Sequence, residues 1–329
     1  MNHAHRRRLL IAACLAAPFA ALAQQPGKLR RIGVLSLSVS ASEQAQYGRL
    51  IFASWLRNAG FEEGQNLAVE WRYAEGDAKR LPALADELVK LNVEVLVASF
   101  NDAIAAAQRA TRTIPIVMLN SLGPVEQGFV ASLARPGANI TGTAWSSPET
   151  GAKILSVLKE AAPRAKRVAL IGNPGMKGAH DFGVVTEKAA ALLGIEAQFF
   201  AATKPEEVAQ ALVRVAAAKP QALYVALDTA LASETRVITD FALKHKLPAI
   251  GNSAQFAEAG GLISYGPDIM EIGVHTLEYV ARILNGAKPA DLPVVLPSKY
   301  ELVINARTAK AIGLKIPQTL LLQASRVIE

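Results

Sequence analysis

Short apolar runs alternate with amphipathic stretches along most of the chain. The apolar runs have the length and composition of β-strands and occupy residues 31–36, 67–73, 93–99, 114–119, 140–144, 167–172, 195–200, 222–227 and 248–251. Helical spacing is found between them, at residues 79–91, 103–111, 151–160, 179–193, 206–218 and 233–245. This alternation predicts parallel β-α-β units and therefore an α/β fold, in a chain long enough for two domains.

The first helix of the pattern follows the strand at residues 31–36. It places five side chains at positions i, i+3, i+4, i+7 and i+8, namely Tyr47, Leu50, Ile51, Ser54 and Trp55. That spacing predicts one buried stripe along the helix.

Two glycine-rich regions break the alternation. A turn at residues 134–139 leads into a strand that contains Gly142 and Thr143, and a second strand at residues 261–268 contains Tyr265 and Gly266. Each region lies where the chain could leave one half of the fold and enter the other. Glycine can absorb the backbone rotation of a hinge because it lacks Cβ. We expect hinge positions at these four residues, with ordinary loop glycines as the alternative.

The amino terminus has the pattern of an export signal. A basic segment ending in three arginines precedes an apolar stretch at residues 9–22, and a small-x-small motif ends at Ala23. The apolar stretch is short for a membrane span, so we expect residues 1–23 to be removed. Cys14 leaves lipid anchoring open as an alternative, and the arginines loosely fit a twin-arginine signal.

Composition excludes several classes of protein. Apolar residues make up 51% and charged residues 19% of the 329 residues, which excludes a disordered chain. Removal of residues 1–23 takes away three arginines and no acid, so the formal charge falls from +7 to +4. The remaining basic residues are scattered, which argues against nucleic-acid binding. Cys14 is the only cysteine, so no disulfide is expected in the processed protein.

No catalytic motif is present in the sequence. There is no Gly-x-Ser-x-Gly elbow, no dinucleotide fingerprint and no phosphate-binding loop. The histidines His180, His245 and His275 are far apart and have no ligand spacing, so no metal site and no cofactor are expected. We interpret His245 as a residue that closes a helix.

Polar residues follow the predicted strands at their carboxyl ends. In open α/β sheets these ends meet at one edge, where ligands bind. The candidate ligand-binding residues are Ser36, Ser38, Phe100, Asn101, Asp102, Asn120, Ser121, Trp145, Asn173, Asp228, Thr229 and Asn252. Uncapped helix N–H groups at this edge would favour a ligand carboxylate, and an ionised Asp228 would favour a ligand ammonium group.

Each candidate also has a structural alternative. Asn101, Asp102 and Asp228 are typical helix N-caps, and Asp228 could instead close an Asx-turn. The other asparagines could close turns in the same way. Trp145 could pack into a core instead of stacking on a ligand.

The chain resembles the exported substrate-binding subunits of ABC importers, and in particular the group with tryptophan- and tyrosine-type binding proteins. The similarity extends over about residues 31–329. Its most specific block runs from Gly123 to Gly142, and further blocks are found at residues 31–36, 73–82, 258–268, 286–293 and 301–310. Phe100-Asn101-Asp102 departs from the Gly-Thr-Pro typical of relatives, and Leu122 and Gly123 replace a Gly-Asp pair, whereas Asp228 fits the family pattern.

The resemblance implies a type I periplasmic-binding fold, in which two doubly wound, Rossmann-like α/β lobes are joined by three crossovers. We expect one lobe at residues 28–142 and 266–288, and the other at residues 143–265 and 289–329. The implied function is the capture of a small polar or amino-acid-like ligand between lobes that hinge shut. The implied protein is a periplasmic monomer without enzymatic activity that delivers its ligand to an ABC permease of the inner membrane.

Two other functions are compatible with the same architecture. A periplasmic sensory co-receptor would pass on a signal instead of its ligand. A two-lobed α/β enzyme is the second alternative, against which the missing catalytic motifs argue.

Overall fold

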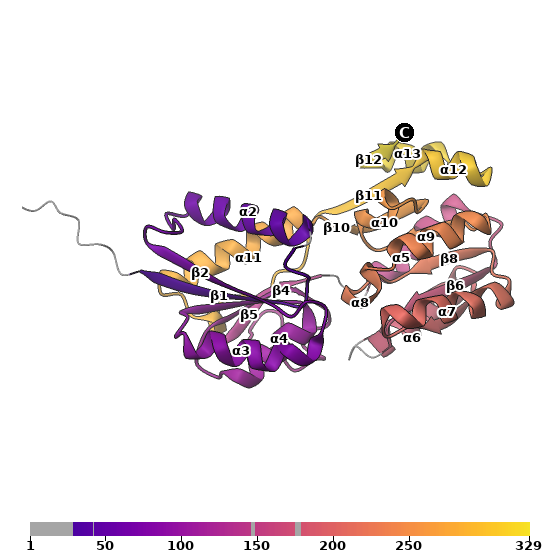
Figure 1. The fold of residues 1–329 in the computed structure, drawn as a ribbon. Helices are drawn as coiled ribbons and strands as arrows, with labels where there is room; N and C mark the ends of the chain where they lie inside the picture. The colour runs from indigo at the N-terminus through magenta and orange to yellow at the C-terminus, as the bar shows by residue number, and fades with distance from the viewer. Residues whose placement is uncertain (1–28, 42, 146–148, 175–178) are drawn as a thin grey trace, which may run out of the picture.

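The computed structural model describes residues 29–41, 43–145, 149–174 and 179–329. These residues form two lobes that lie side by side (Figure 1). The predicted export signal, with Cys14 and the cleavage position after Ala23, lies outside the described residues. Among the helices of the described segments, none has both the length and the apolarity needed to cross a membrane.

The first lobe is built on a five-stranded parallel sheet with the order β2-β1-β3-β4-β5. Its strands are β1 (Arg30–Ser36), β2 (Leu67–Tyr73), β3 (Val95–Ser99), β4 (Ile116–Ser121) and β5 (Ile140–Ala144). Its helices are α2 (Glu43–Asn58), η1 (Ala78–Arg80), α3 (Leu81–Lys90), α4 (Phe100–Ala110), α11 (Ile269–Leu284) and η2 (Pro289–Asp291). Helix α11 comes from the last quarter of the chain, so the lobe is assembled from distant segments (Figure 1).

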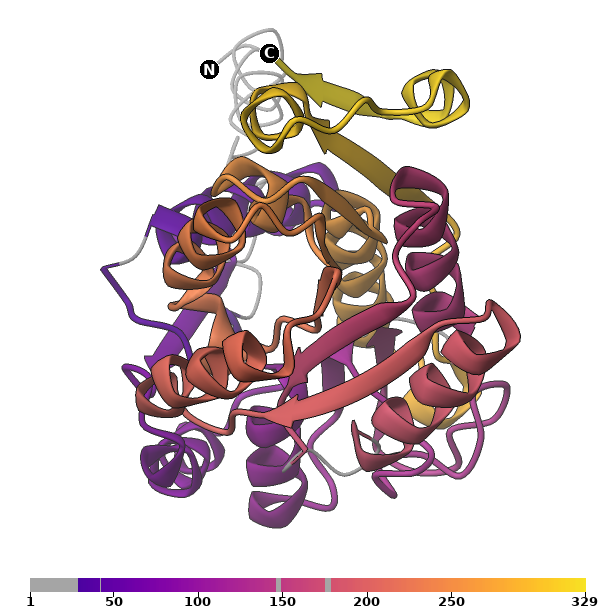
Figure 2. The ribbon, with the colours of Figure 1, turned by 90° about the vertical axis from the view of Figure 1, so that its right-hand side faces the viewer.

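The second lobe contains a seven-stranded sheet with the order β12-β11-β10-β9-β8-β6-β7. Its strands are β6 (Arg167–Gly172), β7 (Glu196–Ala201), β8 (Ala222–Val225), β9 (Ala249–Gly251), β10 (Ile263–Pro267), β11 (Tyr300–Asn305) and β12 (Arg326–Ile328). Its helices are α5 (Glu149–Ala161), α6 (Ala179–Leu192), α7 (Pro205–Ala218), α8 (Thr229–Ala232), α9 (Thr235–Lys244), α10 (Ala254–Glu258), α12 (Ala306–Ile312) and α13 (Gln318–Gln323). The carboxyl-terminal segment forms one edge of this sheet (Figure 2), and β11 runs antiparallel to β10.

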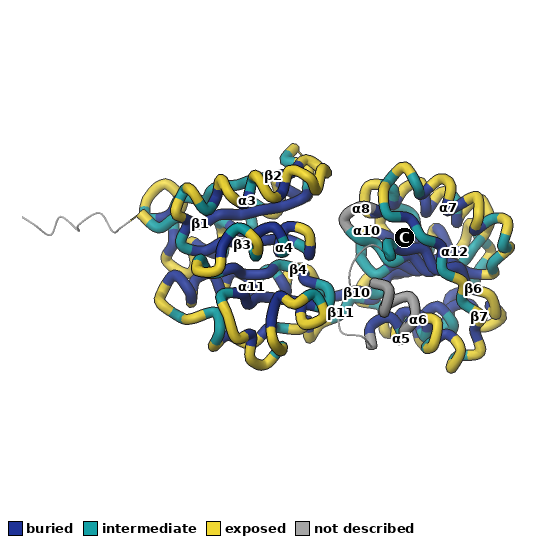
Figure 3. The backbone as a smooth tube through the Cα atoms, turned by 90° about the horizontal axis from the view of Figure 1, so that it is seen from below, coloured by how far each residue is buried: buried dark blue, intermediate teal, exposed yellow. Residues whose placement is uncertain are grey.

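Each sheet is covered by helices on both faces, and each lobe has its own core. In β3, Val95 and Val97 pack on the face that is covered by α2 and α11, whereas Leu96 and Ala98 pack on the face covered by α3 and α4. The same alternation separates two clusters in the second lobe. The buried strands therefore lie at the centre of each lobe (Figure 3), as expected for parallel sheets.

The predicted α/β class and the predicted strands are confirmed, because each strand from β1 to β9 lies close to its predicted position. The alternation did not predict the elements after residue 268. Helix α11 returns to the first lobe, and β11 joins the second sheet in the antiparallel direction. These placements depend on contacts with distant strands, which a local pattern does not contain.

The predicted stripe of helix α2 is wrong in part. Trp55 packs against the core of the first lobe, but Leu50 is 70% exposed, and the buried residues among the described side chains of this helix are Ala45, Phe52 and Leu56. The ring of Phe52 meets the ring of Trp71 in β2 edge-on, with centroids 5.1 Å apart. The buried face is thus set by β2 and α11 rather than by the helical spacing alone. The side chain of Tyr47 lies outside the described residues.

Three chain segments cross between the lobes. They lie between β5 and α5, between β10 and α11, and between Val295 and Tyr300. The segment before Val295 packs on the first lobe: Leu292 belongs to its core, and the N–H of Val295 donates to the carbonyl of Gly142 at 2.9 Å. The packing therefore favours lobe boundaries a few residues later than the predicted residues 142, 265 and 288.

The second and third crossings are bonded to each other. The carboxylate of Glu271, in the first turn of α11, accepts hydrogen bonds from the Ser298 hydroxyl and from the N–H groups of Ser298 and Lys299. The N–H of Asp268 donates to the Lys299 carbonyl at 3.0 Å. Burial raises the pKa of Glu271, but these hydrogen bonds outweigh it, so the pKa lies below its usual value.

Gly142 allows β5 to approach β4 closely. Its φ is +134°, and an added Cβ would lie 2.3 Å from the carbonyl oxygen of Met118. We expect Gly142→Ala to lower the free energy of unfolding by about 3 kcal/mol or more, measured by urea unfolding. As a control, Gly48→Ala in α2 places its Cβ in open space and should stabilise the protein by about 0.5–1 kcal/mol. Equal effects of the two substitutions would contradict this interpretation.

Glu271→Gln removes the charge that joins two of the crossings. At pH 7 we expect the substitution to lower the free energy of unfolding by about 1 kcal/mol. The effect is small because the side chain is partly open to solvent. A carboxylate whose pKa is lowered by folding stabilises the protein above the usual glutamate value of 4.5. The difference in the free energy of unfolding between wild type and Glu271→Gln should therefore disappear as the pH falls below that value. Urea unfolding at pH 7 and pH 3 measures both effects, and Glu187→Gln on exposed α6 serves as the control.

Candidate functional site

The carboxyl ends of the parallel strands lie at the edge of each sheet that faces the other lobe. In the second lobe, α8 follows β8 directly and lies on the side next to the first lobe (Figure 1). The first and second crossings leave from the same edges, at the ends of β5 and β10. Loops and helix amino termini that converge at such edges are the usual ligand sites of open α/β sheets.

In the first lobe, the candidate residues at the ends of β3 and β4 are bonded to each other. The amide oxygen of Asn101 accepts the N–H of Leu122 at 2.9 Å and the hydroxyl of Ser121 at 3.2 Å. Its amide nitrogen donates to the Leu122 carbonyl at 2.8 Å. Asn101 thus ties two strand ends together instead of capping α4, while Asp102 is exposed in the first turn of that helix.

The two serines after β1 also contact each other. The Ser36 hydroxyl donates to the Ser38 hydroxyl at 3.1 Å, and the N–H of Ser38 donates back to Ser36 at 3.2 Å. Ser36 is buried and Ser38 is half-buried. Because Ser36 uses its one O–H donor on Ser38, the Ser38 hydroxyl is the one that can donate to a ligand group.

Two residues at this edge have unusual backbone conformations. Phe100 and Asn120, at the ends of β3 and β4, both have a φ of +63°. For a residue with a Cβ, this left-handed backbone conformation costs about 1–2 kcal/mol of conformational energy, and asparagine adopts it more readily than phenylalanine. The amide oxygen of Asn120 is buried and has no hydrogen-bond partner. The ring of Phe100 lies 6.5 Å from that of Trp145, and the N–H of Trp145 donates to the Ser121 carbonyl at 2.8 Å.

In the second lobe, the polar strand ends also bond within the lobe. The carboxylate of Asp228 caps α8 by accepting the N–H of Leu231 at 2.8 Å, and it accepts the amide of Asn173 at 2.7 Å. The side chain of Asn252 exchanges two hydrogen bonds with the backbone of Leu227, at 3.0 and 3.1 Å. The side chain of Thr229 lies outside the described residues. Asp228 therefore has the capping role, and its role toward a ligand stays a prediction.

The four predicted hinge residues lie within or at the ends of strands. Gly142 and Thr143 belong to β5, where the Thr143 hydroxyl contacts the Thr276 hydroxyl at 3.1 Å. Gly266 belongs to β10, and an added Cβ would lie 2.1 Å from the Asn252 carbonyl oxygen. Close approach explains both glycines without a hinge. Tyr265 stacks on Tyr300 with ring centroids 5.4 Å apart.

Sequence reasoning missed several polar residues near these edges. Beside the end of β2, Arg49 lies over the Tyr73 ring at 5.4 Å. The carboxylate of Glu75 accepts the backbone N–H of Ser40, and hydrogen bonds from the Ser40 side chain and backbone lower the pKa of Glu75. Thr276 could have been found from the sequence, because it is a hydroxyl residue on the apolar face of α11. Nothing in the sequence indicated the hydrogen bonds that Glu271 makes.

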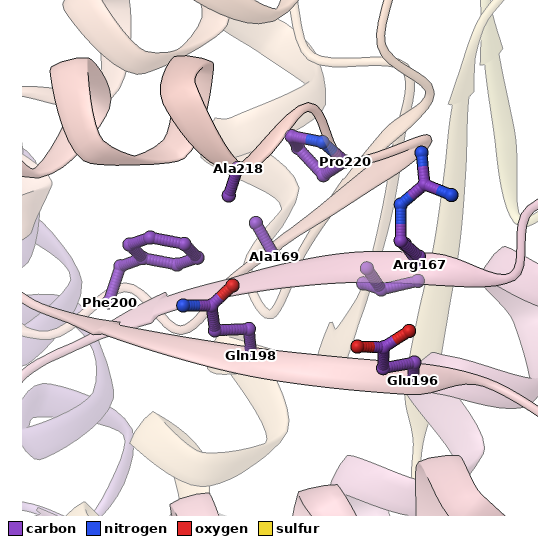
Figure 4. Close-up of a pocket in the computed structure, with 8 residues that line it drawn as sticks. Arg167, Ala169, Glu196, Gln198, Phe200, Ala218 and Pro220 are labelled. Atoms are coloured by element: carbon purple, nitrogen blue, oxygen red, sulfur yellow. The ribbon is translucent and has the colours of Figure 1, made fainter.

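The cavity shown in Figure 4 lies along β6 and β7 of the second sheet. Its lining runs from Arg167 and Glu196, the first residues of these strands, to Phe200 near the end of β7. Neither Asn173 nor Asp228 lines it, and we do not assign it to the same site. Within the described residues, no group of three or more metal-binding side chains is found.

The chain is similar to known proteins in both sequence and structure. The model of a family described as ABC transporter substrate binding protein matches residues 39–328. A tyrosine-binding protein of Clostridioides difficile (strain R20291) is 27% identical over 296 residues, which cover 88% of this chain and 82% of that protein. A conserved domain protein from Vibrio cholerae has a structure with a TM-score of 0.85 and 30% identity, covering 91% of this chain and all of that chain.

The structure of an ABC domain from Streptococcus pneumonia, in complex with L-Trp, is also similar. Its TM-score is 0.82 at 26% identity, and the match covers 91% of this chain and 99% of that chain. More distant solute-binding proteins, with TM-scores of 0.53 to 0.61, share the fold alone. The two lobes and their three crossings thus form a type I periplasmic-binding fold, and the chain belongs to the ABC transporter substrate-binding protein family.

Proposed function

We propose that this protein is the exported solute-binding subunit of an ABC importer, which captures an amino-acid-like ligand between its two lobes. The main support for this proposal is the arrangement of the two sheets. Each has its own core, their edges at the carboxyl ends of the strands face each other, and three crossings join the lobes (Figure 1). A ligand that contacts both edges gains most of its interactions when the lobes close. Binding would therefore shift an open–closed equilibrium toward the closed form.

The chemistry of the two edges supports a ligand that has an ammonium group and an apolar part. Asp228 supplies a carboxylate from the second lobe, and Asn173 and the N–H of Leu231 hold it in place. Ser38, whose hydroxyl accepts from Ser36, and nearby backbone N–H groups can donate to a ligand carboxylate. The names of two similar proteins, a tyrosine-binding protein and a domain in complex with L-Trp, point to the same class of ligand.

The energy that such a site must provide is modest. A micromolar dissociation constant corresponds to about 8 kcal/mol of binding free energy. A few hydrogen bonds in a closed site, together with one charged contact and one stacked ring, can provide it. No covalent step is required, which agrees with the absence of a catalytic motif in the sequence.

The remaining parts of the proposal follow from the family and from the amino-terminal pattern. Residues 1–23 direct the chain out of the cytoplasm and are removed, and the processed monomer acts in the periplasm. The ligand-bound form then docks on an ABC permease of the inner membrane. A sensory role would use the same closure but would lack the delivery step.

The proposal can be tested on freshly purified protein. Native mass spectrometry should detect a co-purifying solute of small mass, and a thermal-shift screen should raise the Tm with one or more of the standard amino acids. X-ray scattering should show a smaller radius of gyration after the ligand is added. If no amino acid raises the Tm and no solute co-purifies, the proposed function is wrong.

Asp228→Asn tests the ammonium contact without removing the helix cap, because asparagine also caps helices well. We expect the affinity for an amino acid found in the screen to fall by about 10- to 100-fold, as one charged hydrogen bond is lost. Asp77→Asn, at the residue that caps η1, should leave the affinity unchanged. Isothermal titration calorimetry measures both variants. An unchanged affinity for Asp228→Asn would remove Asp228 from the site.

A further inference from the structure

We propose that Phe100 is a specificity-determining residue, whose ring forms with Trp145 an aromatic wall across the end of β4 and selects ligands with a planar apolar group. The inference rests on the proposed function and goes further, since it assigns the choice among ligands to one side chain. Four observations support it: the backbone conformation of Phe100, its contact with Trp145, its exposure, and the way its neighbour is held.

The backbone of Phe100 has no local explanation. Six non-glycine residues among the described ones have a positive φ, namely Glu75, Asn92, Phe100, Asn120, Lys219 and Lys246. Glu75, Asn92, Lys219 and Lys246 are exposed polar residues at turns or at the ends of helices, where this conformation is common. Phe100 is the only one of the six with an apolar side chain, and it lies at a strand end beside Asn120. Glycine would adopt this conformation without strain, so a phenylalanine at this position has a backbone cost that a glycine would not have.

The two rings reach toward each other over an intervening strand. The sheet order places β4 between β3 and β5, so Phe100 and Trp145 come from strands that are roughly 9–10 Å apart. Their ring centroids are nevertheless only 6.5 Å apart, with an angle of 48° between the planes. The rings therefore approach each other across the end of β4, which carries Asn120 and Ser121. A ligand bound at this strand end would lie close to them.

Both aromatic residues are half-buried rather than part of a core. Neither belongs to a buried cluster of the first lobe or to the apolar residues packed against those clusters. Their exposed faces can take up further apolar contact, which a ligand ring would supply by stacking. The same faces offer little to a small polar solute.

Asn101 makes the position of Phe100 rigid. It is buried, and its side chain forms three hydrogen bonds with Ser121 and Leu122 at the end of β4. The strained residue is therefore fixed between β3 and a helix that is tied to the neighbouring strand. A wall that is held in this way binds a ring without first losing its own freedom of motion.

The test compares two substitutions to glycine at residues with positive φ. Phe100→Gly relieves the backbone and removes the ring, whereas Lys219→Gly relieves the backbone at the exposed end of α7, which is distant along the chain. Phe100→Tyr keeps a ring at the same place. The probes are L-tryptophan and L-leucine, titrated by calorimetry into wild type and the three variants, and thermal unfolding confirms that each variant is folded.

We expect the wild type to bind L-tryptophan more tightly than L-leucine. Phe100→Gly should lower the affinity for L-tryptophan by about tenfold or more and reduce the discrimination between the two probes. Lys219→Gly should leave both affinities unchanged, and Phe100→Tyr should stay within about threefold of wild type. The Tm of Phe100→Gly should remain within a few degrees of wild type, so that unfolding does not explain the loss.

Two results would overturn the inference while the proposed function stands. One is a wild type that binds L-leucine as tightly as L-tryptophan, and the other is a Phe100→Gly variant that keeps the wild-type discrimination. A wild type that binds neither of these probes, nor any amino acid of the wider screen, overturns the proposed function and the role of Phe100 with it.

Discussion

The separation of the apolar residues into two cores is the constraint on which the rest of this structure depends. Each sheet is covered on both faces, and the clusters around Leu96 and Val97 in one lobe and around Leu170 and Ile171 in the other account for the main packing. Each lobe is thereby complete with respect to its own sheet. The lobes are then connected mainly by the three chain crossings between them. Glu271, which joins two of these crossings, is accordingly a residue of the connection rather than of either core.

The polar residues at the sheet edges form hydrogen bonds within their own lobes and so stabilise the fold itself. Beyond its last residue a strand has no ladder partner, so the backbone groups at its end need other hydrogen-bond partners. Asn101 provides them for Leu122, and Asn252 provides them for Leu227 in the other lobe. The two lobes thus use the same device, an amide side chain that bonds to the backbone at the end of the neighbouring strand. Such cross-links tie the ends of neighbouring strands together at one edge of each sheet.

The sequence was sufficient for the strands because burial on both faces makes them continuous apolar runs, and β8 around Tyr224 is an example. It was not sufficient for the orientation of α2, since the exposure of Leu50 depends on where α11 packs, more than 200 residues later. At the site, the pattern indicated the residues at the strand ends but not their bonds. The pairing of Asn173 with Asp228 and the left-handed backbone of Phe100 arise from the arrangement of neighbouring strands. A single sequence carries no local signal for either.

The position of helix α11 in the chain also affects the order in which the two lobes can fold during synthesis. One face of the first sheet, with Ile32, Val34 and Val95, is covered in part by Leu277, Val280 and Ile283 of this helix. Synthesis reaches these residues only after both sheets have been mostly made. Until then the amino-terminal half carries an uncovered apolar surface, and it cannot reach its final state as an independent unit. The interleaved chain path thus delays the maturation of the lobe made first until nearly the whole polypeptide exists.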